Sequence, residues 1–169
     1  MTANSEADAI QSRVAEAHRK AKVIVLLLAA SVIVYAIVGL VLVNAREPRV
    51  VSSQVPIPFY VAAVFLALGS IALRRAQLRR LRLDVVAGLR GVAGLVNHFM
   101  QVAVVSAALA EIIGVLAFVI VFFGGGQSDV LRLGVVALAV TLYAYPRRAA
   151  WQRAVDYYVA TMPGVAEMR

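Results

Sequence analysis

Four long apolar runs divide the sequence into alternating apolar and polar stretches. They cover about residues 23–43, 57–73, 96–123 and 130–145. A helix needs roughly 20 apolar residues to cross a bilayer core of about 30 Å, and a shorter run can span it where the bilayer thins or flanking side chains reach the interface. The pattern therefore predicts an all-α integral membrane protein with four transmembrane helices in a single membrane domain.

The polar stretches between and beyond these runs predict the connections. Residues 46–58 contain three prolines, which exclude a long helix and indicate a loop. Three glycines at 124–126 end the third run, after which Ser128 or Asp129 is expected to cap the fourth helix. Amphipathic helices are expected before the first run and in the tail, residues 146–169, which is predicted to lie at the membrane interface. Aromatic residues typical of an interfacial belt mark that end: Tyr143, Tyr145, Trp151, Tyr157 and Tyr158.

The linker from residue 74 to 95 is rich in arginine, yet its apolar residues recur near helical spacing. They are Leu73, Leu78, Leu81, Val85 and Leu89. This pattern favours a cytoplasmic helix that extends the second or third span, and a docking surface for an acidic partner is the alternative. Glycines 88, 91 and 94 indicate either close helix packing or a flexible joint.

Composition supports a membrane protein and excludes several other classes. Hydrophobic residues make up 62% of the chain and the mean hydropathy is +0.84, which is too apolar for a water-soluble surface. The net charge is +8, but the basic residues flank apolar runs, so anionic lipid headgroups rather than nucleic acid are the expected partner. Arg outnumbers Lys fifteen to two, a bias typical of GC-rich bacterial genomes, and this points to a bacterial inner membrane.

The positions of the basic residues predict the orientation. They concentrate before the first run, between the second and third, and after the fourth, whereas the opposite loops carry few. Because positive residues stay cytoplasmic, both termini and the arginine-rich linker are predicted to lie inside. Headgroup contacts are expected from Arg74, Arg75, Arg79, Arg80, Arg82, Arg147 and Arg148.

Glu111 is the single charged residue within the third run. A charge at the centre of a membrane helix costs about 2.5–3.5 kcal/mol on insertion scales, and no other run places a cation at matching depth. The carboxyl group is therefore expected to be neutral or to bind a proton or a sodium ion. Its predicted hydrogen-bond partners on other spans are Ser31, Tyr35 and Ser70.

A stripe of small residues runs along the same helix. Its members recur at intervals of four, three, four and three: Ala103, Ala107, Ala110, Gly114 and Ala117. Such stripes let helices approach closely in lipid. Glu111 lies at the edge of the stripe with Ala107 and Gly114 beside it, so it is expected to point toward a neighbouring helix.

The segment "VAVVSAALAEIIGVLAFVIVFFGG", about residues 102–125, resembles the carboxylate-bearing helix of subunit c, the rotor-ring subunit of rotary ATP synthases. Small residues precede a central Glu, and a small residue, Ala117, follows six places later. The resemblance implies that Glu111 binds the transported proton or sodium ion. Elsewhere the chain departs from that family, because the second run has only Gly69 where the family's partner helix has glycine at every second position. As a whole the chain resembles four-span bacterial membrane proteins that share this helix.

These features lead to two functional hypotheses. The first is an accessory or structural subunit of a larger membrane complex, or a homo-oligomer, with a buried protonatable carboxyl group at Glu111. The second is a subunit c-like element that translocates protons or sodium ions through Glu111. An enzyme is not expected, because no nucleophile and base pair and no metal-binding spacing such as HExxH occurs, and no cofactor or metal site is predicted.

Overall fold

The computed structural model describes residues 3–45 and 57–161, and all regular structure in these ranges is helical. The elements are α1 (Ala3–Asn44), α2 (Ile57–Gln77), α3 (Arg80–Val119), the short 3-10 helix η1 (Ile120–Phe123), α4 (Gln127–Ala144) and α5 (Arg148–Thr161). The predicted all-α class is confirmed, and four helices are long and apolar enough to cross a membrane, as expected of a multi-pass membrane protein. The predicted loop lies outside the described residues except for Ile57 and Pro58, which begin α2.

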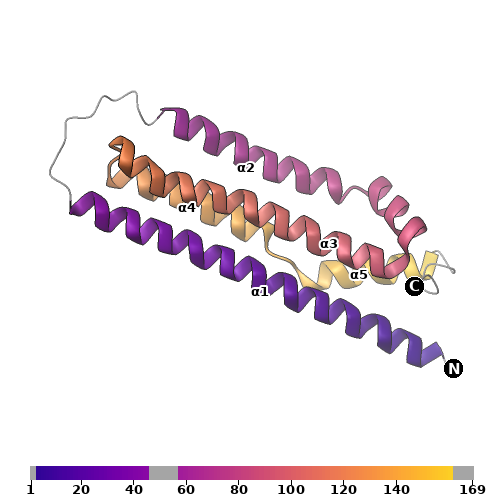
Figure 1. Ribbon diagram of the computed structural model, residues 1–169. Coiled ribbons are helices and arrows are strands. Elements are labelled where there is room, and N and C mark those ends of the chain that lie inside the picture. The colour runs from indigo at the N-terminus through magenta and orange to yellow at the C-terminus, as the bar shows by residue number, and fades with distance from the viewer. Residues whose placement is uncertain (1–2, 46–56, 162–169) are drawn as a thin grey trace.

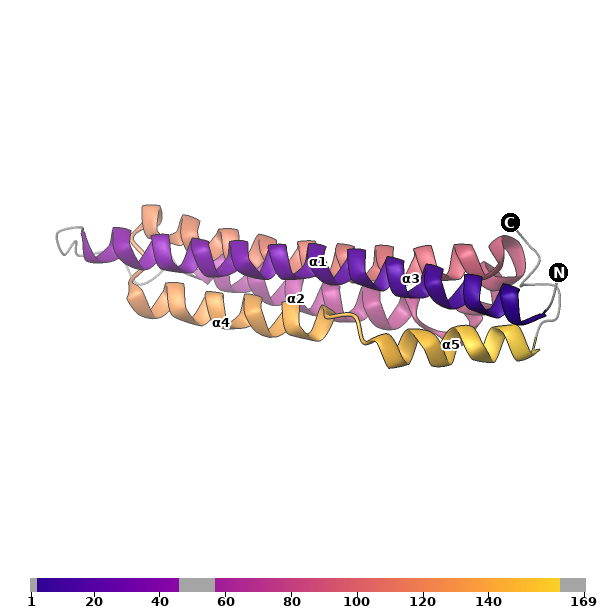
Figure 2. The same ribbon diagram turned by 90° about the horizontal axis from the view of Figure 1, so that it is seen from below.

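The four long helices run up and down alongside one another (Figure 1). α3 and α4 form a central pair, and α1 and α2 pack mainly on opposite sides of that pair (Figure 1). Seen from below, α5 continues in the direction of α4 (Figure 2). α1 begins and α5 ends at the same end of the bundle as the α2–α3 junction, which we call the terminal end. At the other end α3 turns into α4.

Small and β-branched side chains fill the space between the long helices. The buried residues there, which we call the bundle core, are Val32, Ala63, Ala110, Ile113, Ala117, Ile120, Val121, Val130, Leu133, Ala137 and Val140. Large apolar side chains point outward instead: Phe65 is 74% exposed and Leu68 is 60% exposed. An apolar exterior around a close-packed interior is suited to acyl chains rather than to water.

A second group of buried residues lies at the terminal end, where α5 packs on α1 and α3. This terminal cluster contains Val14, Ala21, Leu83, Ala87, Val92, Leu95, Val96, Phe99, Trp151, Val155 and Tyr158. The Trp151 ring stacks on Phe99 and meets His18 edge-on, each with centroids 5.6 Å apart. The Tyr158 hydroxyl donates to Asp84 Oδ1 at 2.6 Å.

The aromatic residues of the predicted interfacial belt have different environments. Trp151 and Tyr158 are buried because α5 packs on α1 and α3. Tyr143 and Tyr157 are exposed, and Tyr145 is half-buried.

Gly91 divides α3 into two parts. Its φ of 63° and ψ of −166° lie outside helical values, in a region that residues with a Cβ rarely adopt. Residues 80–90, which we call the foot segment, consequently turn away from the rest of α3 at the terminal end (Figure 1). The linker pattern left open which span it extends, and the structure joins it to α3. The helix bends at Gly91. At Gly88 a built Cβ would have no neighbour within 4 Å, so close packing does not require a glycine there.

The turn between η1 and α4 corrects the predicted cap. α4 begins at Gln127 with Gly126 as its N-cap, so neither Ser128 nor Asp129 occupies that position. Asp129 lies in the first turn, where its Oδ2 accepts a hydrogen bond from the Gly126 N–H at 2.9 Å. The same carboxylate accepts a bond from the Tyr60 hydroxyl at 2.6 Å, which links α2 to α4.

Candidate functional site

Glu111 lies on α3 opposite Ser31 of α1. Ser31 Oγ is 2.7 Å from Glu111 Oε1 and 2.8 Å from the carbonyl oxygen of Leu28. A serine hydroxyl carries a single hydrogen, so it can donate to only one of these two oxygens. A carboxylate could accept that hydrogen. Alternatively, a protonated carboxyl group could donate to Ser31 Oγ while the hydroxyl donates to Leu28. The contact therefore accommodates both protonation states.

The carboxyl group lies at the edge of the α1–α3 interface. Glu111 is half-buried, and the next residue, Ile112, is 46% exposed on the outside of the bundle. Among the described residues Lys20 forms an ion pair with Glu16, and no cation pairs with Glu111. No group of three or more His, Cys, Asp or Glu that could hold a metal ion occurs in residues 3–45 and 57–161.

All five small residues of the α3 stripe are buried: Ala103, Ala107, Ala110, Gly114 and Ala117. Gly114 marks the closest approach of α1, because a Cβ built there would lie 2.9 Å from Val32 Cγ2. Gly134 of α4 faces Ala36 of α1 less closely, because a Cβ built there would lie 3.5 Å from the alanine Cβ, an ordinary van der Waals contact. Small residues on α3 and α4 therefore let α1 pack close enough for the Ser31–Glu111 contact.

Of the three predicted partners of Glu111, Ser31 is the one that contacts it. Tyr35, one turn further along α1, packs its ring against Phe118 at a centroid distance of 6.3 Å. Ser70 lies on α2 and donates to the Ser106 carbonyl oxygen at 3.2 Å. The Ser106 hydroxyl is itself fully buried and has no hydrogen-bond partner among the described residues.

The predicted headgroup arginines have two kinds of environment. Arg74 is half-buried, donates Nη1 to the Tyr143 carbonyl oxygen and lies 5.0 Å above the Tyr143 ring, so it ties α2 to α4. The side chain of Arg80 lies outside the described residues. The remaining five are exposed: Arg75, Arg79, Arg82, Arg147 and Arg148.

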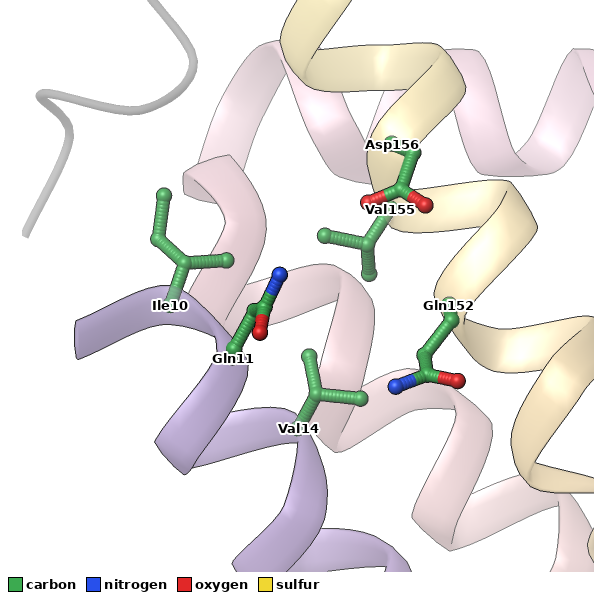
Figure 3. Close-up of a pocket in the computed structure, with 6 residues that line it drawn as sticks. All are labelled: Ile10, Gln11, Val14, Gln152, Val155 and Asp156. Atoms are coloured by element: carbon green, nitrogen blue, oxygen red, sulfur yellow. The ribbon is translucent and has the colours of Figure 1, made fainter. Parts of the chain in front are cut away.

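Three hollows at the terminal end have no counterpart in the sequence predictions. One of about 250 Å³ lies between α1 and α5 and is lined by Gln11, Val14, Gln152 and Asp156 among others (Figure 3). One of about 260 Å³ lies between α1 and α3 and includes Arg13, Lys20 and Asn97.

The third hollow is a groove of about 310 Å³ where the end of α2 faces α3. It is lined by Leu73, Gln77, Arg82, His98, Gln101, Val102 and Val105. His98 Nε2 lies 3.1 Å from the Gln77 carbonyl oxygen across this groove. His98 and Gln101 lie near the start of the third apolar run, and polar residues at that position are a sequence signal for a polar contact at this level.

No protein-family model, curated protein or solved structure matches the chain.

Proposed function

We propose that this protein is a non-enzymatic structural or accessory subunit of a larger membrane assembly, or a homo-oligomer, in a bacterial inner membrane. Both termini and the α2–α3 junction face the cytoplasm in this proposal. The exposed arginines of the terminal end support that orientation, because positive residues stay cytoplasmic and meet anionic headgroups there: Arg75, Arg79, Arg82, Arg147 and Arg148.

An unpartnered apolar stripe on the foot segment carries the subunit proposal. Leu81, Val85 and Leu89 are 80%, 58% and 75% exposed, and their spacing of four aligns them on one helix face. The opposite face, with Leu83 and Ala87, is buried in the terminal cluster.

The location of the stripe favours a protein partner over acyl chains. The foot segment follows the basic last turn of α2 and so begins beyond the apolar part of that helix. Contiguous apolar surface outside a membrane core is typical of a site that binds another protein or another copy.

The experiment measures the size of the purified protein in mild detergent by light scattering. We expect the wild type to be larger than one chain and Leu89→Glu to shift toward the monomer. Asn97→Glu is the matched control, because Asn97 is also exposed on α3 and the substitution adds the same charge. A monomeric wild type would eliminate the homo-oligomer and leave only an assembly with other chains. An oligomer whose size is unchanged in Leu89→Glu would show that the copies do not meet through the foot segment.

Within this function Glu111 acts as a hydrogen-bonding group that holds α1 on α3. Ser31 Oγ lies close to both the Leu28 carbonyl oxygen and Glu111 Oε1. This geometry favours a protonated carboxyl group, because the carboxyl group then donates to Ser31 Oγ while the hydroxyl donates to Leu28, and both contacts are hydrogen bonds. Infrared spectra at neutral pH are expected to contain a protonated carboxyl band that disappears in Glu111→Gln. A band that appears only in acid would show a charged group instead.

Ion translocation is the second candidate, and the partial exposure of Glu111 favours it. A carboxyl group at the edge of the bundle is accessible to a neighbouring chain, as an ion carrier requires. Protein reconstituted in vesicles would then conduct protons or sodium ions, Glu111→Gln would abolish the flux, and carbodiimide would modify Glu111. Equal permeability with wild type and Glu111→Gln would eliminate translocation by this chain alone.

A further inference from the structure

The groove between α2 and α3 changes from apolar to polar along the bundle. Leu73, Val102 and Val105 line its inner part, and Val105 is 47% exposed to the surroundings of the bundle. Arg82, His98 and Gln101 line the part nearer the terminal end. Val105 follows His98 by seven positions, which corresponds to about 10 Å along a helix. The groove therefore crosses from the apolar span to the level of the basic flanks.

The charge that lines the groove is positive. Arg82 is exposed and no carboxylate is among the lining residues. Gln101 is also exposed and brings amide N–H donors beside it. His98 is held by its contact with the Gln77 carbonyl oxygen, which joins the two walls of the groove. These groups suit an anion with several acceptor oxygens.

We propose that this groove binds one anionic phospholipid. Its phosphate contacts Arg82 and Gln101, and one acyl chain lies against Leu73, Val102 and Val105. A phospholipid combines a charged and an apolar part over this distance, whereas a free phosphate would leave the apolar half uncovered. The headgroup is an anionic one because exposed arginines, Arg75 and Arg79, lie near this junction and would repel a choline group. The site rests on the membrane placement of the four helices and not on the proposed subunit role.

The experiment measures lipid binding to the purified, delipidated full chain in mild detergent by native mass spectrometry. The probes are dioleoylphosphatidylglycerol and dioleoylphosphatidylcholine, which share their acyl chains. We expect tighter binding of the phosphatidylglycerol and about a tenfold loss in Arg82→Gln, the scale of a lost charge-assisted hydrogen bond. Arg90→Gln is the matched control, since it removes the same charge from an exposed residue of the same helix that does not line the groove, and it should change binding less than twofold.

A second pair of variants tests the apolar part of the groove. Val105→Trp should fill the groove and weaken phosphatidylglycerol binding, whereas Ile112→Trp should not. Ile112 is a close match because it is 46% exposed and lies two turns along the same helix. Helix content measured by circular dichroism verifies that each variant is folded.

Several outcomes would overturn the proposal. Equal loss in Arg82→Gln and Arg90→Gln would show diffuse attraction to positive charge. Equal binding of the two lipids would show that the phosphate region does not select an anion. Competition by inorganic phosphate at the concentration of the lipid would show that the acyl chain contributes nothing. None of these results depends on the oligomeric state of the protein.

Discussion

The bundle core and the terminal cluster are built from different side chains although α1 and α3 pass through both. The buried residues of the bundle core are all Ala, Val, Ile or Leu, and the Ser31–Glu111 contact lies beside them. The terminal cluster also contains the rings of Trp151, Phe99 and Tyr158, and His18 meets Trp151 edge-on. Lipid tails are as apolar as the side chains, so helices in a membrane associate by close backbone approach. Where water surrounds the helices, burying large aromatic surface is the stronger driving force.

The largest expected effect is in the terminal cluster. Trp151→Ala removes a ring that stacks on Phe99 and contacts His18, and we expect a loss of about 3–5 kcal/mol of stability. Denaturant unfolding followed by circular dichroism measures it. Tyr157→Ala is the control, because this tyrosine of the same helix is 51% exposed and should change stability little. Equal losses would mean that α5 is not docked through Trp151.

A hydrogen bond in the terminal cluster gives the next effect. Tyr158→Phe keeps the ring and removes the hydroxyl that donates to Asp84, so the expected loss is about 1.5–3 kcal/mol. The same unfolding measurement applies. Asp84→Asn retains an acceptor and should cost less. If Tyr158→Phe were neutral, the ring alone would account for the contribution of Tyr158.

Close packing in the bundle predicts that alanine substitutions at two glycines have opposite effects on stability. Gly114→Ala places a Cβ 2.9 Å from Val32 Cγ2 and should destabilise the α1–α3 contact by about 1–3 kcal/mol. Gly69→Ala meets nothing within 4 Å and should stabilise α2 by up to about 1 kcal/mol through helix propensity. Thermal unfolding in detergent measures both. A stabilised Gly114→Ala would show that α1 does not approach α3 at this point.

The smallest expected effect is the polar contact in the bundle. Ser31→Ala removes the partner of Glu111, and interhelical hydrogen bonds in membranes average about 0.6 kcal/mol. Thr141→Val is a suitable reference, since the Thr141 hydroxyl donates to the Ala137 carbonyl oxygen of its own helix and its loss should leave helix association unchanged. Helix association in detergent, measured by energy transfer between labels on α1 and α3, distinguishes the two. A loss above about 2 kcal/mol would indicate that Glu111 is charged and left unpaired.

Part of the candidate site was predictable from local pattern. The five small residues of α3 recur at helical spacing, and all five are buried. The carboxyl group of Glu111 stands out because its neighbours in the sequence are apolar. The sequence could not choose among Ser31, Tyr35 and Ser70, because all three lie on spans that could face α3. The groove near Arg82 was not foreseen at all, since its walls come from two helices and a bend.

The sequence by itself determined the helical class, the four apolar spans and the basic residues beside them. Hydropathy and helical spacing are properties of a segment and its surrounding medium, so they can be deduced one segment at a time. Only the tertiary structure decided that Ser31 meets Glu111, that α5 buries Trp151, and that the bend at Gly91 joins the foot segment to α3. Those outcomes depend on how each helix is rotated and shifted against its neighbours, and the total packing of all the helices sets that rotation and shift.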